Sequence, residues 1–147
     1  ITRLAEMEIP PYLIGASIIG VVAQRLVRKV CKSCSELKTL NSKENSLAIN
    51  YGVKKARFLN KRNKNCTKCN GAGYKGRVGI YEVMKVNEII RELIMNQSNA
   101  DEIRERAFDD SGRTLLEYGM NLVKNELTTI EEVERVCLLN ETQKEDI

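Results

Sequence analysis

The hydrophobic positions near the start of the chain change their spacing from helical to continuous. Leu13, Ile14 and Ile18 fit one face of a short helix, which two preceding prolines can begin. The apolar run over residues 21–27, in which Gln24 and Arg25 are the polar residues, then predicts a buried strand. Arg25 lies inside this run, and a buried arginine requires a partner. We therefore expect Arg25 either to bind a phosphate or to pair with a carboxylate at the strand edge.

The middle of the chain is typical of short elements separated by turns. Residues 42–52 predict a helix with Ser42 as its N-cap and Gly52 as its left-handed end. Residues 56–60 predict one strand, and residues 77–84 predict a second strand that returns to the core.

Beyond residue 86 the apolar positions repeat at helical spacing. Asn87 begins the first of four expected helices, and the other three begin at an N-cap followed by a glutamate three positions later. These pairs are Asn99 with Glu102, Thr114 with Glu117, and Thr129 with Glu132. Because each helix has one apolar face, we expect one small bundle over residues 87–140, with Cys137 packed in it and a frayed tail over residues 141–147.

Four cysteines form the strongest chemical signal, in the pairs Cys31-Lys-Ser-Cys34 and Cys66-Thr-Lys-Cys69. Two thiols separated by two residues can face one cation from a tight turn, and four thiolates complete the tetrahedron that zinc accepts in structural sites. The pairs are roughly thirty residues apart, so the intervening chain should form a loop or small subdomain that the metal closes. Two disulfides or four unrelated thiols are the weaker alternative, because paired CxxC motifs in a chain without a secretory signal favour a metal.

The charge of the chain is unevenly distributed. The formal net charge is only +4, yet residues 45–81 contain no acidic residue. The basic residues of this segment are Lys54, Lys55, Arg57, Lys61, Arg62, Lys64, Lys68, Lys75 and Arg77. Such a segment predicts a positive surface for a nucleic acid, an anionic membrane or an acidic protein, or simply a solvated loop. Few aromatic residues accompany it, which weakens the nucleic-acid interpretation.

Several kinds of catalytic chemistry are absent from the sequence. There is no histidine, which excludes Ser-His-Asp and Cys-His arrangements and any histidine metal ligand. Gly71 and Gly76 have the spacing of a phosphate-binding loop, but Arg77 and Val78 replace its lysine and hydroxyl residue. No apolar run is long enough for a transmembrane helix or signal peptide, so we expect a cytoplasmic protein.

Several stretches of the sequence resemble the hexameric traffic ATPases of bacterial type II secretion and type IV pilus assembly. The matching residues, in order, are Thr2-Arg3-Leu4, Met7, Pro11, Gln24-Arg25-Leu26-Val27-Arg28, the four cysteines, Gly73-Tyr74-Lys75-Gly76-Arg77, Gly79-Ile80-Tyr81-Glu82, Ala107, Arg113-Thr114-Leu115, Gly119, Thr128-Thr129, Glu131-Glu132-Val133 and Arg135-Val136. The resemblance covers nearly the whole chain. Glu8 and Glu126 are among its departures, since both stand where this family often has glycine.

The resemblance implies an α/β fragment from the C-terminal portion of such an ATPase, an expectation that the start at Ile1 also favours. Residues 1–30 would be the edge of a RecA-like core, residues 31–73 a tetracysteine zinc subdomain, residues 74–86 a return strand and residues 87–140 a helical subdomain. The Walker A and Walker B motifs, which bind ATP and Mg²⁺, would lie upstream. This chain alone should therefore be inactive as an ATPase.

The resemblance also implies sites and partners. Arg25 and Arg28 match arginines near the nucleotide, and the parent protein would be a homo-hexamer at the inner face of the cytoplasmic membrane. There the zinc subdomain would pass ATP-driven motion to an inner-membrane platform protein, without specific binding of nucleic acid. The alternative is a stand-alone zinc module, chaperone-like or nucleic-acid binding, since residues 66–73 look like one CxxCxGxG repeat of DnaJ-type chaperones.

Overall fold

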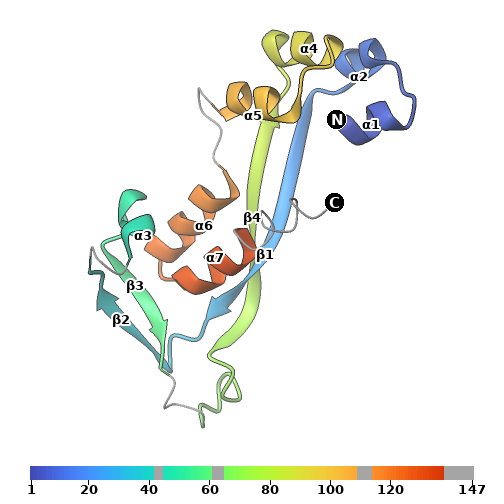
Figure 1. Cartoon of the computed structure of the whole chain (residues 1–147). Coiled ribbons are helices and arrows are strands. Elements are labelled where there is room, and N and C mark those ends of the chain that lie inside the picture. The colour runs from blue at the N-terminus through green and yellow to red at the C-terminus, as the bar shows by residue number, and fades with distance from the viewer. Residues whose placement is uncertain (42–44, 61–64, 109–113, 138–147) are drawn as a thin grey trace. The chain divides into compact units, whose positions relative to one another are not determined.

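The computed structural model describes residues 1–41, 45–60, 65–108 and 114–137. Within these ranges, helices and strands are interspersed up to β4, and only helices follow it (Figure 1). The elements are α1 (Thr2–Glu6), α2 (Pro11–Ser17), β1 (Gly20–Val30), β2 (Ser35–Thr39), α3 (Ser46–Asn50), β3 (Lys55–Leu59), β4 (Tyr74–Lys85), α4 (Glu88–Met95), α5 (Ala100–Phe108), α6 (Leu115–Lys124) and α7 (Ile130–Cys137). The chain is therefore α/β, as expected.

The chain divides into two compact units. Unit 1 comprises residues 1–23 and 82–114, and unit 2 comprises residues 24–81 and 115–147. Helices α4 and α5 belong to unit 1, whereas α6 and α7 belong to unit 2. This division differs from the single bundle of four helices that the sequence predicted.

Unit 1 is built around an apolar cluster to which α2, α4 and α5 contribute. Its buried members are Ile14, Val86, Ile90, Ile94 and Ile103. The Arg91 Nε atom donates to the Gly15 carbonyl oxygen at 2.9 Å, which joins α4 to α2. The Asn87 side chain caps α4 by accepting from the Ile90 amide at 2.9 Å, so the predicted start of this helix is confirmed. Asn99 accepts in the same way from the Glu102 amide at 2.8 Å.

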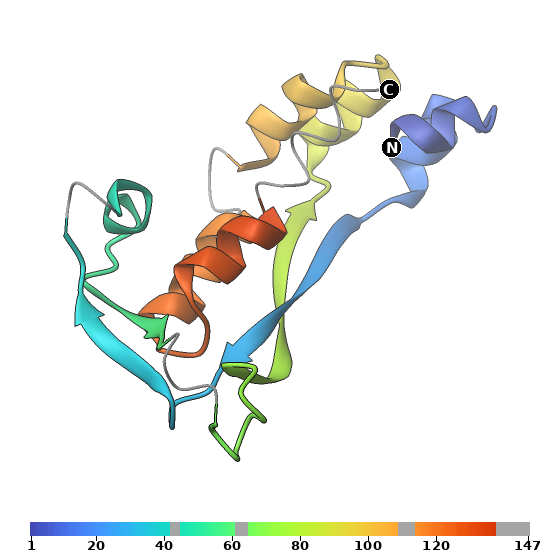
Figure 2. The same ribbon diagram turned by 60° about the horizontal axis from the view of Figure 1, so that its bottom comes forward.

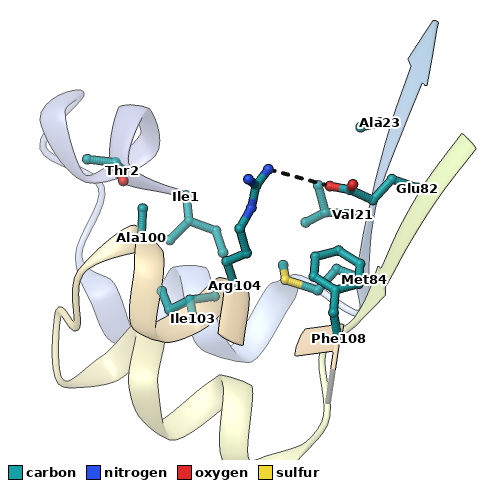
Figure 3. A pocket seen from close by; sticks show the side chains of 10 residues that line it. All are labelled: Ile1, Thr2, Val21, Ala23, Glu82, Met84, Ala100, Ile103, Arg104 and Phe108. Atoms are coloured by element: carbon teal, nitrogen blue, oxygen red, sulfur yellow. Dashed lines mark ion pairs between the residues drawn. The ribbon is translucent and has the colours of Figure 1, made fainter. Parts of the chain in front are cut away.

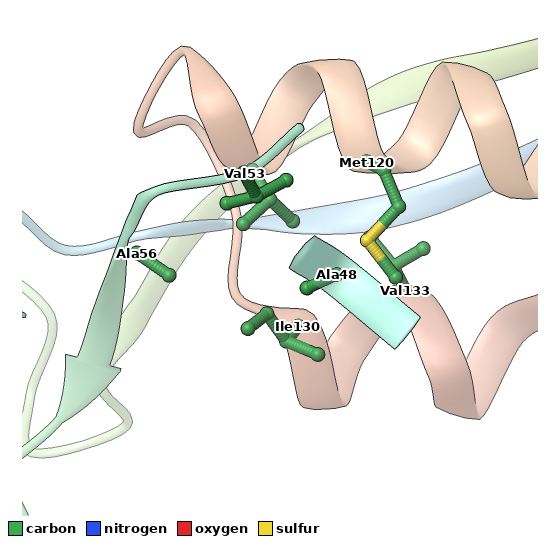
Figure 4. Packing of buried hydrophobic residues seen from close by; sticks show 7 residues of the cluster. Ala48, Val53, Ala56, Met120, Ile130 and Val133 are labelled. Carbon is green, nitrogen blue, oxygen red and sulfur yellow. The ribbon is translucent and has the colours of Figure 1, made fainter. Parts of the chain in front are cut away.

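Unit 2 packs the segment between the two cysteine pairs against α6 and α7. Strands β2 and β3 are antiparallel, with Ser35 opposite Leu59 and Thr39 opposite Lys55, and they lie side by side in Figure 2 as cyan and green arrows. Buried side chains of α3, β3 and the turn between them meet α6 and α7 (Figure 4). The cluster comprises Ala48, Val53, Ala56, Met120, Val123, Ile130 and Val133. Apolar packing against α6 and α7 therefore holds the expected subdomain in place, in addition to its cysteines.

The predicted elements of this segment are found with shifted ends. Helix α3 has Asn45 as its N-cap, and the predicted cap Ser42 lies outside the described residues. Gly52 follows α3 with φ +75°, the left-handed conformation that the sequence predicted. Strand β2 was not predicted, because its residues are exposed apart from the half-buried Ser35 and lack an apolar run.

Strand β1 is present, but the prediction that it is buried is wrong. It pairs with β4, and Val27 and Val30 are its buried residues. Val22 is 63% exposed and Leu26 is 49% exposed. The apolar run therefore predicted the strand correctly but not its burial. The described residues leave most of the surface of β1 uncovered.

Two residues with side chains adopt left-handed backbone conformations where the resemblance indicates glycine. Glu8 has φ +62° and Glu126 has φ +58°. At the second position the Glu126 carboxylate pairs with Arg57, with the Arg57 Nη2 atom 2.7 Å from Glu126 Oε2. This pair links β3 to the loop between α6 and α7, so the side chain offsets part of the backbone strain.

Glu126→Ala should destabilise the chain more than Glu126→Gly does. Alanine loses the pair with Arg57 and keeps the strained φ, whereas glycine loses the pair but relieves the strain, a difference of about 1 kcal/mol. Urea unfolding of both variants and the parent chain measures this difference. Equal stability of the two variants would contradict a strained backbone at residue 126.

Candidate metal centre

The four predicted cysteine ligands meet in one cluster in unit 2. The Sγ atoms of Cys31, Cys34, Cys66 and Cys69 all lie within 4.8 Å of one another. The Cys31 and Cys66 sulfurs are 3.9 Å apart, and those of Cys34 and Cys69 are 3.5 Å apart. A tetrahedron with metal–sulfur bonds of about 2.3 Å has sulfur–sulfur edges of about 3.8 Å. The four cysteines could therefore hold one metal ion, and the set of four thiols is consistent with zinc.

Each cysteine pair is shaped by a tight turn. In the first pair, the Cys31 carbonyl oxygen accepts from the Cys34 amide at 3.3 Å and from the Ser35 amide at 3.0 Å. In the second pair, the Cys66 carbonyl oxygen accepts from the Gly71 amide at 3.1 Å. These turns point both thiols of each pair to the same side, as the CxxC spacing predicted.

Gly73 connects the two turns. Its amide donates to the Cys69 sulfur at 3.3 Å, and its carbonyl oxygen accepts from the Cys31 amide at 2.8 Å. Its φ is +75°, and a Cβ atom at this position would lie 2.8 Å from the Leu59 Cδ2 atom. Only glycine satisfies both the backbone conformation and the space available.

The thiols differ in their electrostatic surroundings. Burial, together with hydrogen bonding to the neighbouring cysteines, raises the pKa of Cys34 to about 12. A backbone hydrogen bond from Cys69 lowers the pKa of Cys66, the least buried of the four, to about 7. A divalent cation would favour the thiolate form of all four side chains, so its binding would release protons.

The two arginines predicted to bind nucleotide have different surroundings. Arg25 is exposed, and its Nη1 atom donates to the Gln24 carbonyl oxygen at 2.9 Å, so the prediction of a buried arginine is wrong. Arg28 forms an ion pair, with its Nη2 atom 2.6 Å from the Glu132 Oε2 atom. The Arg28 guanidinium also lies 4.1 Å from the centre of the Tyr74 ring. Both side chains are exposed, but the Arg28 guanidinium is held by Glu132, whereas the Arg25 guanidinium contacts a backbone carbonyl.

Glu132 is a central residue that the sequence indicated only as part of a capping box and of the family resemblance. The Glu132 amide does donate to Thr129 Oγ1 at 3.3 Å, which confirms the cap. The carboxylate, however, is fully buried and binds Arg28 and Arg135. Burial alone would raise the pKa of Glu132, but the hydrogen bonds from Arg135 and Arg28 lower it to about 2. The spacing of Glu132 and Arg135, three residues apart on a helix, was the available signal.

The basic segment is partly exposed. Arg57 pairs with Glu126, so it does not contribute a free charge. Lys61, Arg62 and Lys64 lie outside the described residues. The exposed basic residues of the segment within the described ranges are Lys54, Lys55, Lys68, Lys75 and Arg77.

Unit 1 contains a mainly apolar cavity of about 210 Å³ (Figure 3). Ile103 and Met84 line it, and the Arg104 Nη2 atom lies 3.9 Å from the Glu82 Oε1 atom at its wall. No helix within the described ranges is both long and apolar enough to span a membrane.

Comparison with known proteins identifies the family. A family model described as type II/IV secretion system protein matches residues 1–135. The type II secretion system ATPase E of Vibrio cholerae is 35% identical over 136 residues, which are 92% of this chain and 26% of the relative. The type IV pilus assembly ATPase PilB of Thermus thermophilus is 40% identical over 135 residues, 90% of this chain and 15% of the relative.

A further relative supports the same assignment. The type II secretion system protein E of Pseudomonas aeruginosa is 39% identical over 137 residues, 92% of this chain and 26% of the relative. The chain belongs to the type II/IV secretion system protein family, which confirms the resemblance noted from the sequence. It spans about a quarter or less of the length of these relatives.

Proposed function

We propose that this chain is the C-terminal zinc-binding and helical part of a cytoplasmic ATPase that powers type II secretion or type IV pilus assembly. The family match over residues 1–135 is the observation that carries this proposal. Residues 1–30 are the edge of a RecA-like core, residues 31–73 are the zinc subdomain, and residues 74–86 are the return strand. The Walker A and Walker B motifs that bind ATP and Mg²⁺ lie in the parent protein outside this chain, which does not hydrolyse ATP by itself.

The proposed role is mechanical. ATP turnover in a homo-hexameric parent moves this part of the protein, and the basic surface of the zinc subdomain passes the movement to a platform protein at the inner face of the cytoplasmic membrane. The exposed residues Lys54, Lys55 and Lys68 support this role, because they give the subdomain a positive surface that suits an acidic partner. The membrane association is thus peripheral and made through partners.

Reversing two of these charges tests the mechanical role. Lys54→Glu combined with Lys55→Glu in the complete protein should abolish secretion or piliation, because it opposes the field that attracts an acidic partner. ATP turnover should persist, since neither side chain is buried. Lys85→Glu, which is exposed but outside the acid-free segment, is the control and should retain function. Normal assembly in the double variant would contradict this route of transmission.

We further propose that Arg25 contacts a nucleotide phosphate, with Arg28, three residues further along β1, as the second candidate. The exposure of the Arg25 guanidinium supports this assignment, whereas Arg28 is occupied by Glu132. Arg25→Ala in the complete protein should slow ATP turnover at least about tenfold, the size of one lost charge-assisted hydrogen bond, without loss of the fold. Lys29→Ala, an exposed residue of the same strand, is the control. Unchanged turnover in the Arg25 variant would exclude the phosphate contact.

The second candidate function is a stand-alone zinc-binding module, chaperone-like or nucleic-acid binding. It is supported by the CxxCxGxG pattern of residues 66–73 and by the exposed basic side chains. Binding to DNA or RNA that weakens steeply with salt would favour it. The family match over nearly the whole chain favours the ATPase interpretation.

A further inference from the structure

The segment that carries the cysteines belongs to unit 2, and its two ends join the rest of that unit at points close in space. Strand β1 leads into Cys31, and β4 begins directly after Gly73. The Cys31 amide donates to the Gly73 carbonyl oxygen at 2.8 Å, so the two ends of the segment meet at its base. Contacts that hold these two ends together therefore also orient the two cysteine pairs toward each other.

Residues of the turn before α7 form hydrogen bonds with both strands at this base, β1 and β4. The Val30 amide donates to the Leu127 carbonyl oxygen at 2.9 Å. The Thr128 hydroxyl donates to the Arg28 carbonyl oxygen at 2.9 Å. On the returning side, the Tyr74 hydroxyl is hydrogen-bonded to the Thr129 Oγ1 atom at 2.9 Å. Residues far apart in the sequence thus clamp the entrance and the exit of the cysteine segment together.

The Glu132 carboxylate is the central group of this clamp. Its Oε1 atom accepts from both the backbone amide and the Nε atom of Arg28, each at 3.0 Å. Its Oε2 atom accepts from Arg28 Nη2 at 2.6 Å and from Arg135 Nε at 3.0 Å. The same guanidinium of Arg28 lies against the Tyr74 ring. One buried carboxylate therefore positions the backbone and the side chain of Arg28, and through that side chain the ring that follows Gly73.

We propose that Glu132 is a positioning residue for the metal centre, holding β1 and β4 so that the two cysteine pairs face each other before a metal binds. Arg28 lies three residues before Cys31, and Tyr74 follows the glycine whose amide donates to the Cys69 sulfur. Prior alignment of the pairs reduces the loop-closure entropy that metal binding must offset. This inference rests on the proposed zinc centre.

The carboxylate geometry is essential to this role. The fork of Arg28 meets both oxygens of Glu132, and a glutamine can accept at only one of its two terminal atoms. Glu132→Gln keeps the size of the side chain but removes this two-point contact. The zinc dissociation constant should then rise about tenfold, the lower end of the range for residues that orient metal ligands indirectly. The four thiolate ligands themselves remain.

The test measures zinc affinity and zinc release rate by competition with a chelator, for the 147-residue chain and its Glu132→Gln variant. Glu131→Gln, an exposed neighbour on α7, is the matched control. The absorption spectrum of the Co²⁺-loaded variant should still show four-thiolate coordination. Weaker affinity with an unchanged ligand set indicates positioning. A purely structural role would destabilise the metal-free and zinc-bound forms equally and leave the affinity unchanged.

A second variant keeps the inference testable if Glu132→Gln fails to fold. Arg28→Lys retains the charge but loses the fork, and it should also release zinc faster. In a double-mutant cycle, the losses of zinc affinity caused by Arg28→Lys and Glu132→Gln should not add, because both variants remove the same contact between Arg28 and Glu132. Wild-type affinity in both variants would overturn the inference alone. Absence of zinc binding by the wild-type chain would overturn the proposed zinc centre and this inference with it.

Discussion

Removing zinc with a strong chelator is expected to lower the thermal unfolding midpoint of the chain by about 10–15 °C. A ligand present at a thousandfold excess over its dissociation constant stabilises the folded state by about 4 kcal/mol, and each kcal/mol shifts the midpoint by about 2–4 °C for a chain of this size. Calorimetry with and without chelator measures the shift, and plasma mass spectrometry should find about one zinc per chain before chelation.

The loss of structure should be local to the cysteine pairs. Among residues 65–73, only Cys69 is buried, so this turn has no apolar side chain to hold it once the metal is removed. Strand β3 is different, because Ala56 packs in the cluster with Val123 and Val133. Hydrogen exchange should therefore speed up at the amides of Cys31 and Gly73 and change little in β3.

Two cysteine variants provide the matched comparison. Cys69→Ser should lose the metal and reproduce the effect of the chelator, because a hydroxyl is a poor zinc ligand. Cys137→Ala should retain the metal, because Cys137 lies outside the cluster and packs against apolar residues of unit 2. Before chelation, one thiol should titrate readily. Five reactive thiols and no metal would contradict the proposed centre.

The metal site could be predicted from the sequence because the spacing of the two cysteines within each pair is itself characteristic of metal ligands. Two residues between cysteines specify a turn whatever surrounds it, and the structure brings all four sulfurs together. Helix starts were predictable for the same reason, since Asn87 and Asn99 accept from amides only three positions away. Local chemistry therefore determined which of these features could be predicted.

Features that depend on distant residues could not be predicted in this way. Glu132 binds Arg28, and these residues are 104 positions apart in the sequence. The burial of β1 was overestimated, because an apolar run reports strand propensity and not which neighbours cover the strand. The division of the four helices between two units likewise depends on tertiary packing that helical periodicity does not encode. In each case the missing information was long-range contact.

The stability contributed by Glu132 should disappear in acid. Its pKa is about 2 in the folded chain against an ordinary value of 4.5, so the unfolded chain takes up the proton first as the pH falls. The contribution is thus complete above about pH 4.5 and is lost between pH 4.5 and 2, with a size of about 3 kcal/mol. Urea unfolding of the wild-type chain and Glu132→Gln across this range, both with chelator, measures the difference between them.

The comparison of the wild-type chain with Glu132→Gln isolates the protonation of the Glu132 carboxylate. Arg28 and Arg135 face the carboxylate and stay charged throughout, and burial raises the pKa of nearby Tyr74 further above this range. With chelator present, proton competition for zinc does not contribute, and carboxylates common to both chains cancel. The difference in unfolding free energy between the wild-type chain and Glu132→Gln should therefore shrink as the pH falls. A difference that stays constant down to pH 2 would mean that the arginines do not stabilise a buried charge at Glu132. The base of the cysteine segment would then be held by its other hydrogen bonds, those of the Val30 amide, the Thr128 hydroxyl and the Tyr74 hydroxyl.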